Sequence, residues 1–495
     1  MKRILFSLLA MLALASGALA QGTIRVAVGT TIRQLDPAKT TIGDEYIYVH
    51  LVFNGLTRID RDLSVKPDLA ESWSASDDLK TWTFKLRDGV KWHSGRTLDA
   101  EDVVATMTRI LDPKTGSRAR ANISMVTKVE AVDPRTVRFT LNIPYAGFQD
   151  IFGERQMRIV PKDKIDSLST APIGTGPFKV KSWAPGDRME LVRNPDYFEK
   201  GLPKADGVTI RIIPEAAARV AALESGAIDI LWNMPYESVA KFKSHPTVRT
   251  DSIPTASWDG VILNNAIKPF NDVRVRQALA ATIDKEALVE LAIFGQGAPT
   301  FSPIPPSHPY FNKSLKLAKP DIAKAKKLLA EAGYPNGFEV PLQVPQEREA
   351  RVRLGVAVRD MARAAGIRIN IERVPFASYS ANVAGKAKMY VDGYFARPTI
   401  DTALYPFYHS TGSWNTRLWL YKNARVDEIL DTARKTNDEA KRKVLFLEFQ
   451  KIVDETVTSL IAYSAAHVNG VSKKVEGFGS TPMMWLELKG VTVKP

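Results

Sequence analysis

Short runs of alternating hydrophobic and polar residues recur along this chain of 495 residues, and longer amphipathic segments separate them. Alternation with a period of two is typical of half-buried β-strands. Strands that alternate with helices predict an α/β protein built on a sheet. The segments predicted as strands are 23–29, 82–86, 136–141, 178–183, 189–192, 208–213, 228–231, 257–263, 339–344, 367–374 and 460–463.

Helix starts are indicated by acidic or amide side chains, which accept hydrogen bonds from free backbone N–H groups. Asp99, followed by Asp102, is a variant of the capping box at the start of a helix that ends before Pro113. Capping accounts for these carboxylates better than a metal site does. Asn271 and Asp284 are expected to cap two more helices, and others are predicted at 214–225, 321–332, 351–365 and from about 426 to 458.

The stretch 391–415 has no sustained period, and Pro398, Pro406 and Gly412 interrupt it, so most of it is predicted to be loop. A single cation, Arg397, lies among six aromatic residues there. Such a group suits a concave site that stacks on a ligand and pairs with its charge. Alternatively, the rings cap a hydrophobic core and Arg397 extends to solvent. The aromatic residues are Tyr394, Phe395, Tyr405, Phe407, Tyr408 and Trp414.

The first twenty residues have the features of a secretory signal peptide. Lys2 and Arg3 precede an apolar run, and Ala18-Leu19-Ala20 forms a small-x-small cleavage site. The chain has no cysteine, so it lacks the residue that a bacterial lipoprotein anchor requires. We therefore expect export to a Gram-negative periplasm without a lipid anchor.

The charge balance points to small partners. The signal carries two of the 68 basic residues and none of the 54 acidic ones, which leaves the mature chain at about +12. This charge favours anionic ligands or a membrane surface. The basic residues are scattered without a long run, so nucleic acid is not expected as a partner.

Motifs for catalysis and for metal or cofactor binding are missing. The six histidines show no i,i+4 pair, and no nucleophile elbow or phosphate-binding lysine loop occurs. His409-Ser410 is the one pair that suggests a hydrolase, and adjacent residues rarely orient each other for catalysis. We therefore predict neither an enzyme nor a metal or other cofactor.

Several long motifs, in order along most of the mature chain, resemble those of one family. The family is that of the large periplasmic solute-binding proteins of peptide-type ABC importers, family 5, with dipeptide-, oligopeptide- and nickel-binding members. The matching motifs are L-D-P at 35–37, W-T-F-K-L-R-D-G-V-K-W-H-S-G at 82–95 with A-E-D-V behind it, I-G-T-G-P-F at 173–178, N-P-D-Y-F at 194–198, P-F-N-D-V-R-V-R-Q-A-L at 269–279 and L-L-A-E-A-G-Y-P-N-G-F at 328–338.

The resemblance implies a two-lobe periplasmic-binding-protein fold of class II type, in which an extra domain is inserted into lobe I. After a signal peptide at 1–20, it places lobe I at 21–45, 170–257 and 470–495, the inserted domain at 46–169 and lobe II at 258–469. The lobes would close on a solute by a hinge motion and present it to an inner-membrane ABC permease. A monomer is the family expectation.

The resemblance also identifies a departure from the family at the expected binding loop. Peptide-binding relatives read like G-W-x-x-D, and the aspartate pairs with the amino terminus of the peptide. Here Gly393-Tyr394-Phe395-Ala396-Arg397 stands at these positions, so Arg397 replaces the carboxylate. A buried cation would repel an ammonium group, whereas a guanidinium matches carboxylate or phosphate.

We therefore expect a small anionic or conjugated solute at Arg397, for example an opine-like conjugate, an acidic sugar derivative, an aromatic acid or an unusual peptide. An ordinary di- or oligopeptide is the alternative, and Asp392 or Asp401 would then hold its amino terminus. A signalling receptor or an extracytoplasmic enzyme is less favoured. The remaining candidate binding residues are Gly393, Tyr394, Phe395, Trp414, Asn415, Trp258, Arg33 and Arg348.

Overall fold

The computed structural model describes residues 22–40, 45–397 and 399–494. The predicted signal peptide at 1–20 and Pro398 of the binding segment lie outside the described residues. In the described part, no helix is both long and apolar enough to cross a membrane.

Eleven strands of the described residues form one mixed sheet. They are β1 (Thr23–Val28), β8 (Phe178–Ala184), β9 (Arg188–Arg193), β10 (Gly207–Ile212), β11 (Ile230–Leu231), β12 (Val248–Leu263), β13 (Gly297–Pro299), β14 (Phe338–Pro345), β15 (Ile367–Val374), β16 (Met389–Tyr394) and β17 (Ser459–Ser472). The order across the sheet is β15-β14-β16-β12-β17-β11-β1-β10-β9-β8, and β13 pairs with β17. This arrangement confirms the predicted α/β class.

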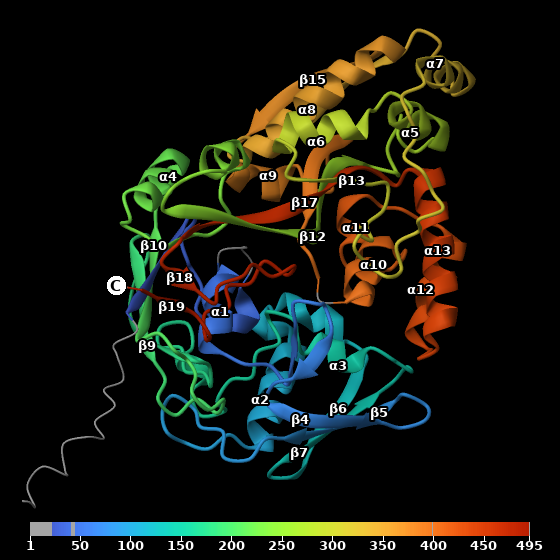
Figure 1. Cartoon of the computed structure of the whole chain (residues 1–495). Helices are drawn as coiled ribbons and strands as arrows, with labels where there is room; N and C mark the ends of the chain where they lie inside the picture. The colour runs from blue at the N-terminus through green and yellow to red at the C-terminus, as the bar shows by residue number, and fades with distance from the viewer. Residues whose placement is uncertain (1–21, 41–44, 398, 495) are drawn as a thin grey trace, which may run out of the picture.

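Two long antiparallel strands, β12 and β17, run across the molecule and join its two halves (Figure 1). Their register shifts between Pro254 and Trp258, where β12 holds more residues than the facing part of β17. Such a bulge bends the strand that carries it. The predicted boundary between lobes at 257/258 falls in this bulge, and the second boundary, at 469/470, falls within β17. The division into lobes remains a prediction. Lobe I, lobe II and the inserted domain are used as names for the predicted residue ranges.

Helices pack around the part of the sheet formed by lobe II (Figure 1). Asp284 caps α6, as the sequence predicts, whereas Asp272 rather than Asn271 caps α5. Asp321, predicted as the start of a helix, caps α7. Helix α1 (Glu45–Val52) lies at the start of the range predicted for the inserted domain, but its buried residues share a core with β1 and β10 of the main sheet. The helices of the main sheet and of lobe II are α4 (Ala216–Glu224), α5 (Val273–Ala280), α6 (Lys285–Ile293), α7 (Ile322–Glu331), α8 (Glu349–Ala362), α9 (Phe376–Asn382), α10 (Ile400–Tyr408), α11 (Asn415–Leu418), α12 (Ala424–Arg434) and α13 (Glu439–Thr456).

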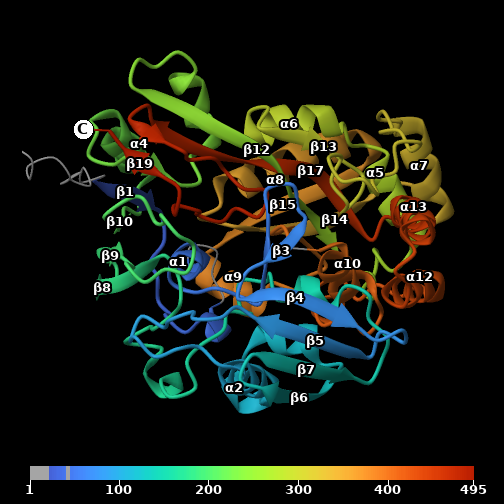
Figure 2. The same cartoon turned by 60° about the horizontal axis from the view of Figure 1, so that its bottom comes forward.

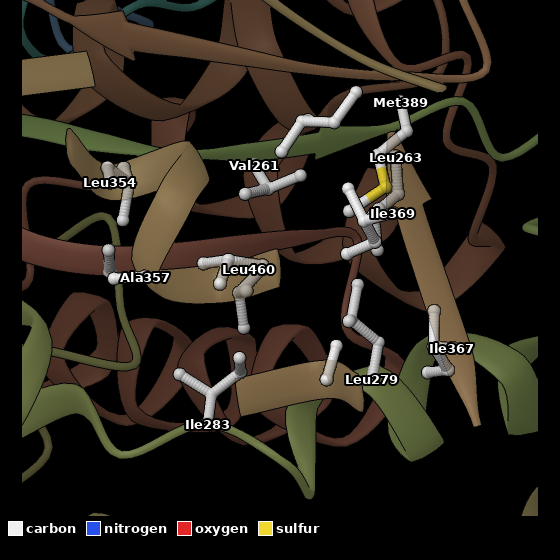
Figure 3. Packing of buried hydrophobic residues seen from close by; sticks show 14 of the residues in the cluster. Val261, Leu263, Leu279, Ile283, Leu354, Ala357, Ile367, Ile369, Met389 and Leu460 are labelled. Atoms are coloured by element: carbon white, nitrogen blue, oxygen red, sulfur yellow. The ribbon is translucent and has the colours of Figure 1, made fainter. Parts of the chain in front are cut away.

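The core of lobe II forms where the helices cover the sheet. Val261 of β12 and Leu460 of β17 contribute to one buried cluster with Met389 of β16, together with Leu279 of α5 and Leu354 of α8 (Figure 3). Each of these large side chains contributes about 1.5–3 kcal/mol on burial. The strands that later present the binding segment are therefore anchored in a rigid core.

The inserted domain contains a separate four-stranded antiparallel sheet, which lies beside the main sheet (Figure 2). Its helix α2 has the capping box predicted at Asp99 and Asp102, and Asp102 also pairs with Arg96. The elements of this domain are β2 (Thr57–Ile59), β3 (Val65–Pro67), β4 (Ala70–Ala75), β5 (Thr81–Leu86), α2 (Ala100–Leu111), β6 (Val126–Asp133), β7 (Thr136–Leu141) and α3 (Phe148–Ile151). The sheet order is β4-β5-β7-β6.

The segment 391–415 is more regular than the sequence predicts. Strand β16 continues to Tyr394, helix α10 spans Ile400–Tyr408, and α11 begins at Asn415. Thr399 and Thr402 form a capping box, and Pro406 is accommodated inside the helix. Loop was the wrong prediction because the strand is held by pairing with distant β12 and the helix start is held by hydroxyl caps.

The chain ends in an extended tail that packs against the first part of the chain. Two short strands, β18 (Val475–Glu476) and β19 (Thr492–Val493), pair with each other. Between them, Met483 and Trp485 share a buried cluster with Ile59 of β2 and Ala396 of the binding segment. The tail thus contacts all three predicted parts of the molecule.

Candidate functional site

Strand β16 holds the start of the predicted binding segment beside β12. Tyr394 lies opposite Trp258, and Gly393 lies opposite Asp259. A Cβ atom on Gly393 would lie 1.8 Å from Oδ1 of Asp259 and 2.5 Å from a guanidinium nitrogen of Arg351. Glycine is required here because two side chains from neighbouring elements approach its Cα closely.

Arg351 of α8 binds two carboxylates at this point. Its Nε lies 2.9 Å from Oδ1 of Asp259, and its Nη1 lies 2.7 Å from Oδ1 of Asp392. Burial raises the pKa of Asp392, and the charge of Arg351 opposes that rise. The carboxylate of Asp392 is therefore already paired inside the protein, which disfavours it as the anchor for a ligand ammonium group.

Asp401, the other carboxylate considered for an amino terminus, is also paired. Its oxygens lie 2.8 Å from Nε and 3.0 Å from Nη2 of Arg434. The hydroxyl of Tyr145 in the inserted domain donates to the same carboxylate. Asp401 is buried and holds a bidentate arginine, so it too has no free side for a ligand ammonium group.

Arg397 faces the inserted domain rather than solvent. Its Nη1 lies 3.4 Å from Oε1 of Glu154, and its guanidinium carbon lies 5.9 Å from the ring centre of Tyr394. Its side chain is 19% exposed, and Glu154 is fully buried. Burial opposes the charge of Arg397, but Glu154 and the nearby tyrosines outweigh that effect, so its pKa is raised.

A second arginine, Arg155, approaches the same place from the inserted domain. Its Nη2 donates to the backbone oxygen of Ala396 at 2.8 Å, and its Nε lies 3.7 Å from Oε2 of Glu154. Its guanidinium carbon lies 4.4 Å from the ring centre of Tyr46 on α1. Glu154 is thus shared between Arg155 and Arg397, and burial lowers the pKa of Arg155.

A third arginine, Arg118, completes the group. Its guanidinium carbon lies 5.6 Å from the ring centre of Trp414. Burial raises the pKa of Tyr46, and the charges of Arg155, Arg397 and Arg118 all lower it. All three arginines are therefore near enough to the hydroxyl of Tyr46 to affect its ionisation. We call Arg118, Arg155, Arg397 and Glu154 the arginine cluster. It carries three positive charges and one negative charge.

Aromatic rings form the lobe II side of the arginine cluster. Tyr394 stacks on Trp258 at 5.9 Å, and Phe407 of α10 meets Tyr394 edge-on at 4.5 Å. Phe407 in turn stacks on Trp414 at 5.8 Å. The rings pack against a core, as the alternative interpretation expects, but Arg397 pairs with Glu154 instead of extending to solvent. Ligand binding at this segment stays a prediction.

Three buried polar atoms around this wall have no hydrogen-bond partner among the described residues. They are the hydroxyl of Tyr394, Nε1 of Trp258 and Nε of Arg155. A buried donor without an acceptor costs about 1–3 kcal/mol. Native proteins satisfy such groups with water or with a ligand.

The other predicted binding residues have different surroundings. The side chain of Asn415 is buried and bonds to the backbone of His409 and Tyr421, so it holds the local loop in place. Phe395 is 41% exposed, and Arg33 is exposed after β1. Arg348 precedes α8, with its guanidinium carbon 5.0 Å from the ring centre of Phe376. The structure thus gathers Arg397, Tyr394, Gly393, Trp258 and Trp414 at one place.

Sequence reasoning did not identify Glu154, Arg155, Arg118 or Tyr46. The run Gly153-Glu154-Arg155-Gln156-Met157-Arg158 is buried in the structure despite its polarity. A dense charged run between apolar segments was the available signal, since buried charges require partners. Arg397 lies 243 positions from its partner Glu154, and no local pattern predicts such a pairing.

The fold and this group of residues define a class of protein. A sheet joined by two long strands, with cations and aromatic rings between two parts of the chain, is typical of two-lobe solute-binding proteins. The chain belongs to the bacterial extracellular solute-binding proteins, family 5, whose model matches residues 64–415. This family confirms the resemblance predicted from the sequence.

Relatives cover nearly the whole chain. The glutathione-binding protein GsiB of Escherichia coli O1:K1 / APEC is 30% identical over 483 residues, covering 95% of this chain and 94% of that protein. The periplasmic binding protein AgaA of A. tumefaciens R10, solved with agropinic acid, has a TM-score of 0.86 and 28% identity, covering 96% of this chain and 99% of AgaA. DppA of Helicobacter pylori, an ABC transporter-associated periplasmic binding protein solved with the peptide STSA, has a TM-score of 0.84 and 26% identity, covering 96% of this chain and 98% of DppA.

Proposed function

We propose that this protein is the periplasmic substrate-binding component of an ABC importer and that it captures a small solute carrying negative charge. The solute binds between lobe II and the inserted domain, at the arginine cluster. The observation that carries the proposal is the combination of three arginines with one carboxylate, beside buried polar atoms of Tyr394 and Trp258 that have no hydrogen-bond partner among the described residues.

The charge balance favours an anion over a cation. Among the described residues, Glu154 is the one carboxylate paired with Arg155 and Arg397, so a ligand carboxylate or phosphate would remove repulsion within the arginine cluster. A ligand ammonium group would add a further positive charge at low dielectric. Planar guanidinium groups also match the two oxygens of a carboxylate.

The ordinary-peptide alternative requires a carboxylate that can receive an amino terminus. Asp392 is paired with Arg351 and Asp401 with Arg434, so each would have to give up a buried arginine. Breaking a buried ion pair costs about 3–5 kcal/mol. The anionic solute is therefore the favoured ligand, and among the named relatives AgaA was solved with an acid, agropinic acid.

The proposal includes delivery without chemical change. The protein is exported by its signal peptide to the periplasm without a lipid anchor, and it acts as a monomer with an inner-membrane permease. The named relatives are binding proteins, which supports binding rather than catalysis as the function. The lobes rotate about β12 and β17 to enclose the solute and to release it.

The test is to identify the solute that the protein retains. Native mass spectrometry of protein purified without refolding gives the mass of the bound compound. Its thermal stabilisation is then titrated on the wild type, on Arg397→Ala and on Arg363→Ala, which removes an exposed arginine. Tight binding raises the midpoint by mass action.

An anionic compound that stabilises the wild type and Arg363→Ala but not Arg397→Ala supports the proposal. A peptide with a free amino terminus that still stabilises Arg397→Ala would refute it. In that case Asp392 and Asp401 become the residues to vary.

A further inference from the structure

A pocket adjoins the arginine cluster, since its lining residue Arg158 donates to the backbone oxygen of Glu154. It occupies about 510 Å³, including the part open to solvent, between the end of α1, the inserted domain and the C-terminal tail. All of its described lining residues belong to lobe I or the inserted domain. A ligand there would be held without any residue of lobe II.

Nitrogen atoms without partners line this pocket. Trp485 of the tail is 4% exposed, and its Nε1 has no hydrogen-bond acceptor in the described part of the chain. The same holds for Nε of Arg58, and Nε2 of His50 is likewise buried without a partner. An indole N–H can only donate, so Trp485 requires an acceptor. The ring of His50 stacks on Trp485 at 4.1 Å and fixes its orientation.

Most charged groups around the pocket are already satisfied by the protein. Lys489 lies 2.7 Å from both carboxylate oxygens of Glu199. Asp68 accepts from the backbone of Gly55 at 3.0 Å, and Arg158 donates to two backbone carbonyls. These groups set the local potential, but they offer little to a ligand.

Glu487 is different. Among the described residues its carboxylate has no hydrogen-bond donor, and it lines the pocket. Burial raises the pKa of Glu487, while Arg61, Lys489 and Arg58 lower it. The pocket therefore combines two buried N–H donors, which have no acceptor among the described residues, with one half-buried carboxylate that no described residue binds.

We propose that this pocket binds a small zwitterion of the α-amino-acid type. The ligand carboxylate accepts from Nε of Arg58 and Nε1 of Trp485, and the ligand ammonium group donates to Glu487. A simple anion would face the carboxylates of Glu487 and Asp68, and a simple cation would face Arg58 and Lys489. Only a ligand with both charges complements both sets of groups.

Glycine is the smallest probe of this chemistry, with acetate and methylammonium as its two halves. The full chain is labelled with 5-fluorotryptophan, and Trp485→Phe assigns the resonance of Trp485 among the nine tryptophans. Each probe is titrated at millimolar concentration while fluorine NMR follows this resonance. Glu487→Gln tests the ammonium contact, and Glu476→Gln, which removes an exposed carboxylate elsewhere in the tail, is the matched control.

We expect glycine to shift the Trp485 resonance more strongly than either half-ligand. Glu487→Gln should weaken glycine binding about tenfold or more, because a charge-assisted hydrogen bond is lost, and Glu476→Gln should leave it unchanged. Arg363→Ala, which removes an exposed arginine outside both sites, should also leave it unchanged. Acetate acting as strongly as glycine, or no shift with any of the three probes, would overturn the proposal.

Discussion

Replacing Tyr145 with phenylalanine removes one hydroxyl group and one hydrogen bond between the inserted domain and lobe II. In the structure this hydroxyl donates to the carboxylate of Asp401, and both residues are buried. Arg434 keeps its two contacts with Asp401 in the variant, since both residues lie in lobe II. The substitution therefore removes a contact between lobes without leaving a carboxylate unpaired.

The expected magnitude follows from the type of bond. A hydrogen bond to a charged group contributes about 1.5–3 kcal/mol. If the inserted domain and lobe II are apart in the free protein, water bonds to Tyr145 and Asp401 before the ligand binds. The full free energy of their hydrogen bond is then gained when the protein closes on the ligand. Tyr145→Phe should then raise the Kd of the captured solute roughly 10- to 150-fold.

Isothermal titration calorimetry with the solute identified by mass spectrometry measures this change, and small-angle scattering shows whether the free protein is open. Tyr379→Phe is the matched control. Its hydroxyl donates to the backbone oxygen of Val391 at 2.5 Å, and both residues lie in lobe II. It should lower Tm but leave Kd unchanged. Equal Kd values for Tyr145→Phe and the wild type would refute the assignment of this bond to the closed state.

Three further substitutions test stability. Asp401→Ala leaves Arg434 buried without its carboxylate and should cost about 3–5 kcal/mol of unfolding free energy in urea. Burial raises the pKa of Asp150 to about 7. Folding therefore favours the protonated carboxyl, and stability falls as pH rises from about 4 to 7. Asp150→Asn should raise Tm near pH 8 but not near pH 4, with a gain in unfolding free energy of at most about 4 kcal/mol near pH 8. Gly393→Ala places a methyl group against Asp259 and should cost about 1–3 kcal/mol in urea and weaken solute binding.

Each of these expectations can fail in a specific way. An unchanged urea midpoint for Asp401→Ala would show that Arg434 finds another partner. An equal Tm gain for Asp150→Asn near pH 4 and pH 8 would show that the carboxyl of Asp150 is exposed to water in the folded wild type. Wild-type stability and affinity in Gly393→Ala would show that β16 shifts away from β12 at no cost.

Local sequence patterns predicted the elements whose signals are local. Asp284 caps α6 as expected, and the unit of β14, α8 and β15 lies where alternation and amphipathicity placed it. The failure at 391–415 has a physical reason. Strand β16 depends on pairing with β12, more than a hundred residues earlier, and no local period records that pairing.

The same limit applies to the site. Arg397 and the rings near it could be predicted, because a cation among aromatic residues is a local feature. Arg155 and Glu154 could not, because their importance arises only when the inserted domain meets lobe II. Asn415 was predicted to bind the ligand, but its side-chain amide forms hydrogen bonds with the backbone of its own loop.

The bulge between Pro254 and Trp258 has a mechanical consequence. Two strands joined by a ladder of hydrogen bonds resist stretching and sliding, but they bend where the ladder is interrupted. If the predicted lobes close by bending at this point, solutes of different shape would bring their outer rims to the same final geometry. A chain built in this way can change its cargo through a few substitutions while the surface that a membrane partner recognises stays constant.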